Sequence, residues 1–380
     1  VRADDLGALV IKAVAERNPE IPLSAYDEVI LGCANQAGDD NRNVARMSLL
    51  LAGLPETVPG ETVNRLCSSG LSAIIHANRA IKAGDGDVFI AGGVENMTRG
   101  PLVISKSSKG YGTDSKMYDS SFGWRFVNPK MKEMHGVDAM GETAENLVEK
   151  YNISREDQDR FALNSQLKAK KAQESGRLAE EIVNVEIPQR KGDAKVVAQD
   201  EFLKPTSTIE GLGKLRAAFK KEGSVTAGNS SGLNDGAAAV IVASADAVKK
   251  YNLKPLARIV SSAVVGVSPR IMGIGPVEAS NKALAKAGLK MEDMDIIELN
   301  EAFAAQSIAC IREWGLQDDD ARINPNGGAI AIGHPLGVTG ARIAYSAALE
   351  LNKTQKRYAL VTMCIGVGQG YAAILERFQA

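Results

Sequence analysis

The sequence predicts an α/β protein that is built from two similar halves with mostly parallel sheets. Each half contains an apolar strand with a polar end, a polar or Gly-rich turn, and a second apolar strand, with helical stretches between them. The first half has these segments at 28–36, 62–70 and 87–95, and the second half has them at 295–303, 323–340 and 358–368. A repeated order of strand, helix and strand is typical of α/β architecture. Because open α/β sheets bind ligands at the carboxyl ends of their strands, we expect the strand ends of both halves to share one cleft.

The expected domain organisation divides the chain into three parts. Residues 1–99 and 184–245 are assigned to the first half, and residues 246–380 to the second half. Residues 100–183 differ in composition and are interpreted as a loop-and-helix insertion that covers the site. Within this insertion, Ser154 is expected to cap the start of a helix that has acidic residues in its first turn.

The composition excludes several classes of function. The chain has 380 residues, with 44% hydrophobic and 24% charged residues, and a net charge of −1. Such balance gives no general attraction to nucleic acids or anionic membranes, and no apolar run is long enough for a transmembrane helix. Four cysteines without a C-x-x-C pair and only three histidines argue against a disulfide framework or a metal site. We therefore expect a cytoplasmic protein in a reducing compartment, with no His-rich metal site.

Cys67 is the first candidate nucleophile. It lies between a strand-like run and a helix that is expected to begin near Ser68. Unpaired N–H groups and the helix dipole at such a position favour thiolate over thiol. A free cysteine is also commonly a small buried apolar side chain, and position alone supports the two interpretations about equally.

Three further residues at strand ends or turns could take part in catalysis. His334 lies in a Gly-rich turn before Pro335 and is a candidate general base or oxyanion donor, although it could simply satisfy backbone groups. Cys364 follows an apolar strand and opens a second Gly-rich turn, whose N–H groups could bind an oxyanion. Asn300 ends another strand, where its amide could hold a water molecule or serve as a cap.

The remaining cysteines and histidines are interpreted as structural. Cys310 is expected in the core because it lies in a helix among Ala and Ile, and Cys33 has a weaker claim to the cleft. His76 lies in an apolar helix and His135 in the insertion.

Five motifs, taken together and in order, resemble the signatures of thiolases. The four main ones are NRLCSSG (64–70), NEAFA (300–304), NPNGGAIAIGHPLGVTGAR (324–342) and CIGVGQG (364–370). The segment TAGNSSGLNDGAA (226–238) is similar to a fifth, which shapes the coenzyme A tunnel. The resemblance covers essentially the whole chain. It implies the thiolase fold, a duplicated βαβαβαββ unit in five α/β layers.

The resemblance also implies a role for each catalytic candidate. Cys67 would attack the substrate carbonyl and carry the acyl group, while His334 would take its proton. His334 and a water held by Asn300 would then stabilise the thioester oxyanion. Cys364 would move the proton at the α-carbon, and the N–H groups of Cys67 and Gly366 would form a second oxyanion hole for the enolate-like charge.

Binding residues are carried over in the same way. Ser231 matches the residue that touches the pantetheine arm, and Phe303 and Met140 match walls of the acyl pocket. Lys204 falls where a basic residue meets the nucleotide end of coenzyme A. Coenzyme A and acetyl-CoA would be substrates rather than cofactors, and the resemblance implies a homodimer or homotetramer.

The chain departs from the thiolase pattern at three places. The first strand and its Arg-Thr-Pro turn, normally found ahead of a segment like VRADDL, are expected to be missing. Ser68 replaces the usual Gly after the nucleophile, as in some other thiolases. Ala139-Met140-Gly141 replaces the His-Met-Gly of acetoacetyl-CoA-specific thiolases, which argues against that substrate.

Several non-catalytic segments resemble the 3-oxoadipyl-CoA (beta-ketoadipyl-CoA) thiolases of aromatic degradation. They are ILGCANQAGDDNRNVARM (30–47), GWRFVNP (123–129), SREDQD (154–159) and PRIMGIGP (269–276). Such a substrate ends in a carboxylate, and Arg125 is our hypothesis for its partner, with a structural ion pair as the equally supported alternative. The other candidate functions are an acetoacetyl-CoA thiolase, a fatty 3-oxoacyl-CoA thiolase of β-oxidation, and a catalytically silent acyl-CoA-binding protein.

Overall fold

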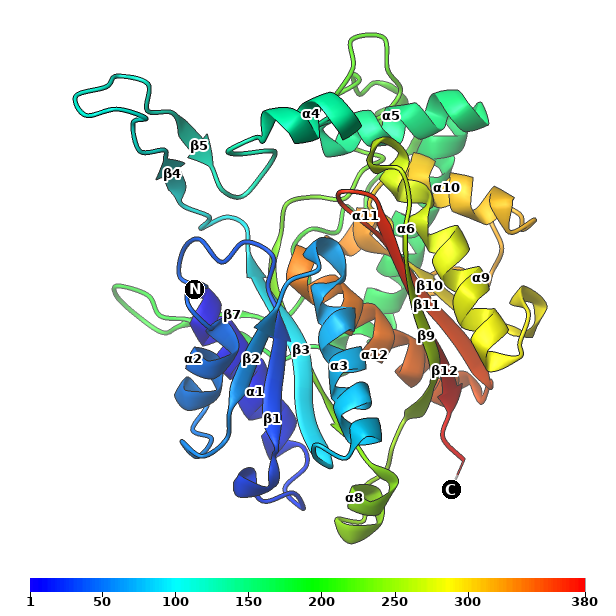
Figure 1. Cartoon of the computed structure of the whole chain (residues 1–380). Coiled ribbons are helices and arrows are strands. Elements are labelled where there is room, and N and C mark those ends of the chain that lie inside the picture. The colour runs from blue at the N-terminus through cyan, green and yellow to red at the C-terminus, as the bar shows by residue number, and fades with distance from the viewer. Residues whose placement is uncertain (380) are drawn as a thin grey trace.

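The computed structural model describes residues 1–379, which form two four-stranded sheets with helices on both faces of each (Figure 1). The first sheet has the order β2-β1-β3-β8. Its strands are β1 (Glu28–Gly32), β2 (Gly60–Val63), β3 (Val88–Asn96) and β8 (Asp235–Ala243). The second sheet has the order β10-β11-β12-β9. Its strands are β9 (Ala257–Gly266), β10 (Ile296–Leu299), β11 (Tyr358–Ile365) and β12 (Gln369–Arg377). The predicted α/β class is confirmed.

The two sheets are mixed, so the prediction of mostly parallel sheets was wrong. β1 pairs in parallel with β2 and β3, and β10 pairs in parallel with β11. β3 and β8, β11 and β12, and β12 and β9 are antiparallel. A short turn joins β11 to β12 and can only produce antiparallel neighbours, because a parallel pair needs a long crossover.

Two aspartates show the internal repeat at atomic detail. Asp27, just before β1, accepts two hydrogen bonds from backbone N–H groups at the start of β3, at 2.7 and 2.9 Å. Asp295, just before β10, accepts two from the start of β11, at 2.9 and 3.0 Å. Each aspartate therefore sets the register between its two parallel strands. β9 has no counterpart in the first sheet, where β8 pairs only with β3 among residues 1–379.

The helices complete five layers. α1 (Ala3–Glu16) and α2 (Val44–Leu51) cover the outer face of the first sheet. α3 (Ser69–Ala83) and α12 (Leu336–Thr354) lie side by side between the two sheets (Figure 1). α9 (Gly275–Ala287) and α10 (Ala304–Glu313) cover the outer face of the second sheet. The central helix layer contributes side chains to a core shared by both sheets, so the two halves bury apolar surface against each other.

A long excursion between β3 and β8 lies outside both sheets. It contains β4 (Leu102–Ile104), β5 (Met117–Asp119), α4 (Pro129–His135), α5 (Met140–Tyr151), α6 (Arg155–Glu174), β6 (Val185–Ile187), β7 (Lys195–Val197) and α7 (Ile209–Gly213). The Ser154 cap is confirmed, because its Oγ accepts from the N–H of Asp157 at 3.0 Å. Of residues 184–245, which we assigned to the first half, β8 alone joins the first sheet.

Short elements complete the chain. They are α8 (Ala245–Lys250), α11 (Ala329–Ile332) and the 3-10 turns η1 (Leu23–Ala25), η2 (Leu66–Ser68), η3 (Leu178–Glu180), η4 (Pro269–Ile274) and η5 (Met291–Asp293). Within residues 1–379, no helix combines the length and the apolar character that crossing a membrane requires.

Candidate active site

Cys67 lies in the 3-10 turn η2, immediately before α3 and between the two sheets. The preceding residue, Leu66, has a positive φ of 47°, a conformation that is costly for a branched side chain. The backbone N–H groups of Cys67 itself and of Gly366 form hydrogen bonds with the Cys67 sulfur. The turn therefore presents the thiol, which is partly exposed, to the turn between β11 and β12.

The surroundings favour the thiol form of Cys67, contrary to the prediction from its position before a helix. Burial raises the pKa of this thiol to about 11, against the opposing effect of the two N–H groups. Desolvation of the anion therefore outweighs the hydrogen bonds that were expected to stabilise it. At neutral pH the resting group is a neutral thiol, and it needs a base in order to act as a nucleophile.

His334 is held in one orientation by residues from two segments. Its backbone N–H donates to Asn234 Oδ1 at 3.0 Å, and its Nδ1 lies 2.7 Å from Thr339 Oγ1. The Thr339 hydroxyl also donates to the carbonyl oxygen of Pro335 at 3.0 Å. Because a hydroxyl has one hydrogen, Thr339 accepts from His334 Nδ1–H, which leaves Nε2 without a proton in the neutral ring.

The free nitrogen of His334 faces the candidate site. Nε2 lies 3.3 Å from Asn300 Nδ2, which can donate to it, and both residues are buried. Burial, together with the positive charge of Arg342, lowers the pKa of His334 to about 3. The imidazole is therefore neutral at physiological pH. A neutral thiol and a neutral imidazole would exchange a proton only as the sulfur forms its bond to the substrate.

Cys364 lies within β11 rather than after it, because the strand continues to Ile365 and pairs Cys364 with Gly370 of β12. It is fully buried in an apolar cluster that includes Phe303, with Met140 packed against it. This burial raises the pKa of its thiol well above the usual value, and the nearby Cys67 adds to the effect. The structure thus brings the two thiols close together in an apolar environment.

Gly366 lies close to the side chain of Leu66, which would have to shift by a few tenths of an ångström to admit a Cβ. A Cβ there would lie 3.2 Å from Leu66 Cδ1 and 3.7 Å from Met140 Sδ. The next residue, Val367, has a positive φ of 63°. Leu66 and Val367 therefore have strained backbone conformations on either side of the thiol. Such strain clusters at functional sites.

Glu95, which the sequence analysis did not identify, joins the two halves beside Cys67. Its carboxylate accepts from the N–H groups of Ala34, Asn35 and Gly337 at 2.9, 3.1 and 2.8 Å. It also approaches Cys33 and Asp40, a grouping that could suggest a metal site. Since three backbone donors already occupy both Glu95 oxygens, the residue serves to fix the start of α12, three residues after His334.

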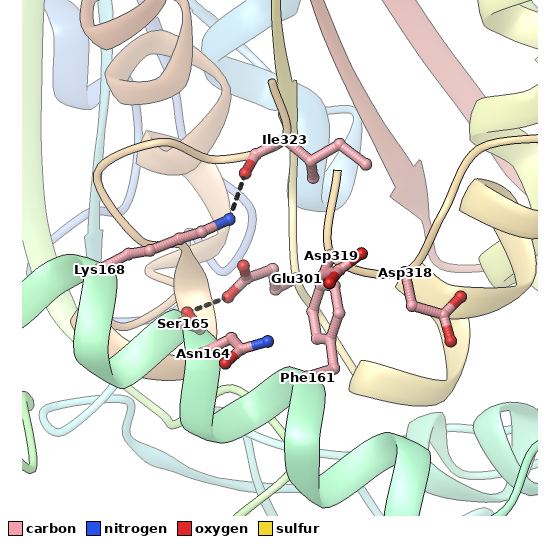
Figure 2. A pocket seen from close by; sticks show the side chains of 8 residues that line it. All are labelled: Phe161, Asn164, Ser165, Lys168, Glu301, Asp318, Asp319 and Ile323. Carbon is pink, nitrogen blue, oxygen red and sulfur yellow. Dashed lines mark hydrogen bonds between the residues drawn. The ribbon is translucent and has the colours of Figure 1, made fainter. Parts of the chain in front are cut away.

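A second buried carboxylate supports the segment before His334 (Figure 2). Glu301 follows Asn300 directly, and it accepts from Ser165 Oγ at 2.6 Å and from the N–H of Ile330 at 3.2 Å. Lys168 lines the same cavity of about 30 Å³ and donates to a backbone carbonyl, at 2.8 Å. Burial raises the pKa of Glu301. These contacts fix the end of β10 relative to α11 and the loop that carries His334.

The residues expected to bind coenzyme A form contacts with one another and with the segment after Asn300. The N–H of Ser231 donates to the carbonyl of Ala302 at 3.0 Å, next to Phe303. Phe303 in turn packs edge-to-face against Phe219, with 6.0 Å between ring centroids. Lys204 Nζ lies 5.6 Å from the centre of the Phe202 ring. A Cβ on Gly232, the residue after Ser231, would lie 2.4 Å from the same ring, so Ser231 and Lys204 share one side.

Arg125 forms hydrogen bonds within the covering excursion. Its Nη1 donates to the carbonyl of Ser120 at 2.8 Å, and its Nη2 donates to Asn35 Oδ1 at 3.3 Å. These bonds anchor the excursion to the loop after β1. Two of the five N–H donors of Arg125 are thereby used by the protein itself.

Comparisons with known proteins agree with this geometry. Residues 1–246 match the family model "Thiolase, N-terminal domain", and residues 253–377 match "Thiolase, C-terminal domain". The chain is 58% identical to a beta-ketoadipyl-CoA thiolase of Acinetobacter baylyi, over 99% of this chain and 94% of the relative. It is 57% identical, with the same coverage, to the 3-oxoadipyl-CoA/3-oxo-5,6-dehydrosuberyl-CoA thiolase of Escherichia coli K12.

The fold is shared with a solved structure. The crystal structure of the Bacillus anthracis acetyl-CoA acetyltransferase superimposes with a TM-score of 0.92 at 41% identity. The match covers 100% of this chain and 93% of that chain. Two family models that together span nearly all of the sequence, and relatives above 50% identity, leave one assignment: the chain belongs to the thiolase family.

Proposed function

We propose that this thiolase cleaves 3-oxoadipyl-CoA with coenzyme A to give acetyl-CoA and succinyl-CoA. The observation that carries the proposal is the 57–58% identity, over 99% of the chain, to thiolases whose names state this substrate. The arrangement around Cys67 and His334 supports the chemistry, because it provides a thiol at the start of a helix and a neutral imidazole whose Nε2 carries no proton.

In the proposed reaction, the Cys67 sulfur attacks the 3-oxo carbon while His334 Nε2 takes the thiol proton. The bond between C2 and C3 then breaks, the acyl group stays on Cys67, and Cys364 protonates the acetyl-CoA enolate. The thiol of coenzyme A next gives its proton to the Cys364 thiolate and attacks the Cys67 thioester. The shortened acyl-CoA leaves, and Cys67 recovers its proton from His334.

Several contacts support these assignments. The N–H of Gly366, which reaches the Cys67 sulfur, and the N–H of Cys67 are placed to stabilise an oxyanion beside it. Asn300 Oδ1 is buried and has no hydrogen-bond partner among residues 1–379, which suits a side chain that holds a water. The nearby Cys364 supplies a second acid while Cys67 carries the acyl group.

Binding roles extend the proposal along the substrate. Ser231 would touch the pantetheine arm, Lys204 would meet the nucleotide end, and Phe303 and Met140 would form walls of the acyl pocket. Arg125 stays a prediction for the terminal carboxylate, through the donors that its protein contacts leave free.

Thiolytic cleavage of three substrates tests the function. We expect a strong preference for 3-oxoadipyl-CoA over acetoacetyl-CoA and a medium-chain 3-oxoacyl-CoA, and no cleavage by a Cys67→Ala variant. A Cys364→Ala variant should lose cleavage by at least about 10³-fold. It should still form the acyl-Cys67 thioester from succinyl-CoA, detectable as a mass increase, because acyl transfer breaks no carbon–carbon bond.

Other results would redirect the assignment. Equal or better turnover of the other two substrates would remove 3-oxoadipyl-CoA as the substrate while leaving a thiolase. Failure to cleave any of them would favour the silent acyl-CoA-binding alternative.

We further propose that the protein is a cytoplasmic homodimer or homotetramer. The four cysteines are all free, which suits a reducing compartment. Apolar side chains on the β4–β5 hairpin, which extends away from the body in Figure 1, support assembly with further copies.

A further inference from the structure

A small pocket lies between the covering excursion and the turn that follows β11. Its lining includes Trp124, His135, Asp138, Met140, Arg270 and Val367. The side chains come from three segments that are far apart in the sequence. The proposed catalytic steps use none of the charged ones.

Two residues that line the pocket, Met140 and Val367, lie next to Gly366. Val367 directly follows Gly366, whose N–H reaches the Cys67 sulfur. Met140 Sδ would lie 3.7 Å from a Cβ on Gly366, and Met140 also packs on the apolar cluster that contains Cys364. Met140 therefore contacts both the apolar cluster around Cys364 and the pocket. The coenzyme A side, at Ser231 and Lys204, is built from other segments.

The guanidinium of Arg270 is the cationic group that could bind an anionic substrate group at this pocket. Its Nε donates to Asp138 Oδ2 at 3.0 Å, and Asn146 Nδ2 donates to the same oxygen at 3.0 Å. Asn146 also donates to the backbone carbonyl of Arg270 at 2.8 Å. Burial opposes ionisation of Asp138, but these hydrogen bonds outweigh it and lower its pKa, so it stays a carboxylate at neutral pH.

The two terminal nitrogens of Arg270 remain available. Within residues 1–379, neither Nη1 nor Nη2 forms a hydrogen bond with the protein, and 63% of the side chain is exposed. An arginine that is oriented through Nε presents its Nη pair as a fork, which matches the two oxygens of a carboxylate. Arg125, by contrast, uses both of its Nη groups in contacts with the protein.

We propose that Arg270, which lines this pocket, binds the terminal carboxylate of a dicarboxylic 3-oxoacyl-CoA and determines specificity for it. The inference rests on the proposed function and names the group that selects its substrate. Asp138 and Asn146 act as positioning residues, since they fix the guanidinium. Met140, which packs against the apolar cluster that contains Cys364, provides apolar surface for the methylene groups between the thioester and the carboxylate.

The test compares two substrates of equal chain length, 3-oxoadipyl-CoA and 3-oxohexanoyl-CoA, which differ by a carboxylate in place of a methyl group. For Arg270→Ala, we expect kcat/KM for 3-oxoadipyl-CoA to fall by about 10- to 100-fold, the usual cost of losing a charge-assisted pair. The value for 3-oxohexanoyl-CoA should change by less than about 3-fold. Arg270→Lys should recover part of the loss, because it restores the charge without the fork.

Two control variants test whether the effect is specific to Arg270. Arg125→Ala tests the competing arginine, and Arg258→Ala removes an exposed arginine that pairs with Glu376 on the second sheet. Equal losses of kcat/KM on both substrates for Arg270→Ala would mean that the Arg270–Asp138 pair is merely structural. An Arg270→Ala variant with no loss on either substrate would also overturn the inference. So would a loss specific to 3-oxoadipyl-CoA that occurs only in Arg125→Ala. Wild-type protein that does not prefer 3-oxoadipyl-CoA over 3-oxohexanoyl-CoA would instead remove the substrate proposal, and the inference with it.

Discussion

At the scale of single residues, one hydroxyl decides which nitrogen of His334 is free. Thr339 Oγ1 donates to the Pro335 carbonyl and therefore accepts from His334 Nδ1. This leaves Nε2 as the acceptor beside Asn300. Without that arrangement, the neutral ring could adopt either tautomer, and one of them would present a proton where the base is needed.

A Thr339→Val variant tests this argument. The substitution keeps the shape of the side chain but removes its hydroxyl, so we expect kcat to fall by about 10- to 100-fold with little change in KM. Thr339→Ser should restore most of the activity, because it returns the hydroxyl. Steady-state kinetics on the preferred substrate measures both. A loss that serine does not restore would show that the methyl group and its packing are what matter.

Residue types at the site were largely predictable, whereas their environment was not. The sequence motifs identified the thiols, the imidazole and the amide, and the structure brings these groups into one region. Thr339 and Asn234 lie within two of the motifs and Glu95 ends a predicted strand, but the sequence assigned no role to them, because their hydrogen-bond partners are known only from the folded chain. Glu301 had a local hint, since it directly follows Asn300.

At the scale of elements, β10 carries an acidic residue in the middle of the core. Glu298 is buried, and this burial raises its pKa to about 8, although the charge of Arg342 opposes the effect. The same group in an unfolded chain has a value of 4.5. Between these two pH values, the folded state binds a proton that the unfolded state has released. Stability from Glu298 is thus complete below about pH 4.5 and is lost as the pH rises through about 8.

A Glu298→Gln variant should remove this dependence, because the amide resembles the protonated carboxyl group. We expect its free energy of unfolding to be similar to that of the wild type at pH 5, and larger by about 1–4 kcal/mol at pH 8.5. Urea unfolding at the two pH values measures the difference. Glu16→Gln, on an exposed face of α1, serves as the control. A variant less stable than the wild type at pH 8.5 would show that Glu298 is ionised and paired with Arg342.

At the scale of the whole molecule, the β4–β5 hairpin stands apart from the five layers (Figure 1). Ile104 and Met117 face each other across its two strands and are 66% and 62% exposed. Leu102 and Tyr111 are also highly exposed. Apolar side chains clustered on a projecting hairpin are a costly surface for a monomer, so the proposed homo-oligomer predicts that this hairpin contacts another copy.

Replacing Ile104 and Met117 together by lysine should weaken that contact. We expect the molar mass from light scattering to fall to a smaller assembly, while the thermal midpoint of the remaining species stays within about 3 °C, because neither side chain belongs to a core. Leu167→Lys, at an apolar position on α6 that is 49% exposed, is the control. An unchanged mass in the double variant, or a monomeric wild type, would contradict the prediction.

The sequence by itself determined the α/β class, the repeat and the kinds of chemical groups at the site. These features depend on local patterns, namely the order of apolar strands, the Gly-rich turns, and a thiol or imidazole at a strand or helix end. The register of each half depends on Asp27 and Asp295, whose hydrogen-bond partners lie 60 and 62 residues further along the chain, so their roles became visible only in the folded chain.

Tertiary structure alone decided how those groups behave. Burial raises the pKa of Cys67 and lowers that of His334, which reverses the expectation drawn from the start of a helix. It also decided how each arginine is held: Arg125 by both Nη groups, and Arg270 by Nε alone, which leaves its two Nη groups without a protein partner among residues 1–379. Desolvation and hydrogen bonding depend on atoms that lie hundreds of residues apart in the chain, and no local pattern records them.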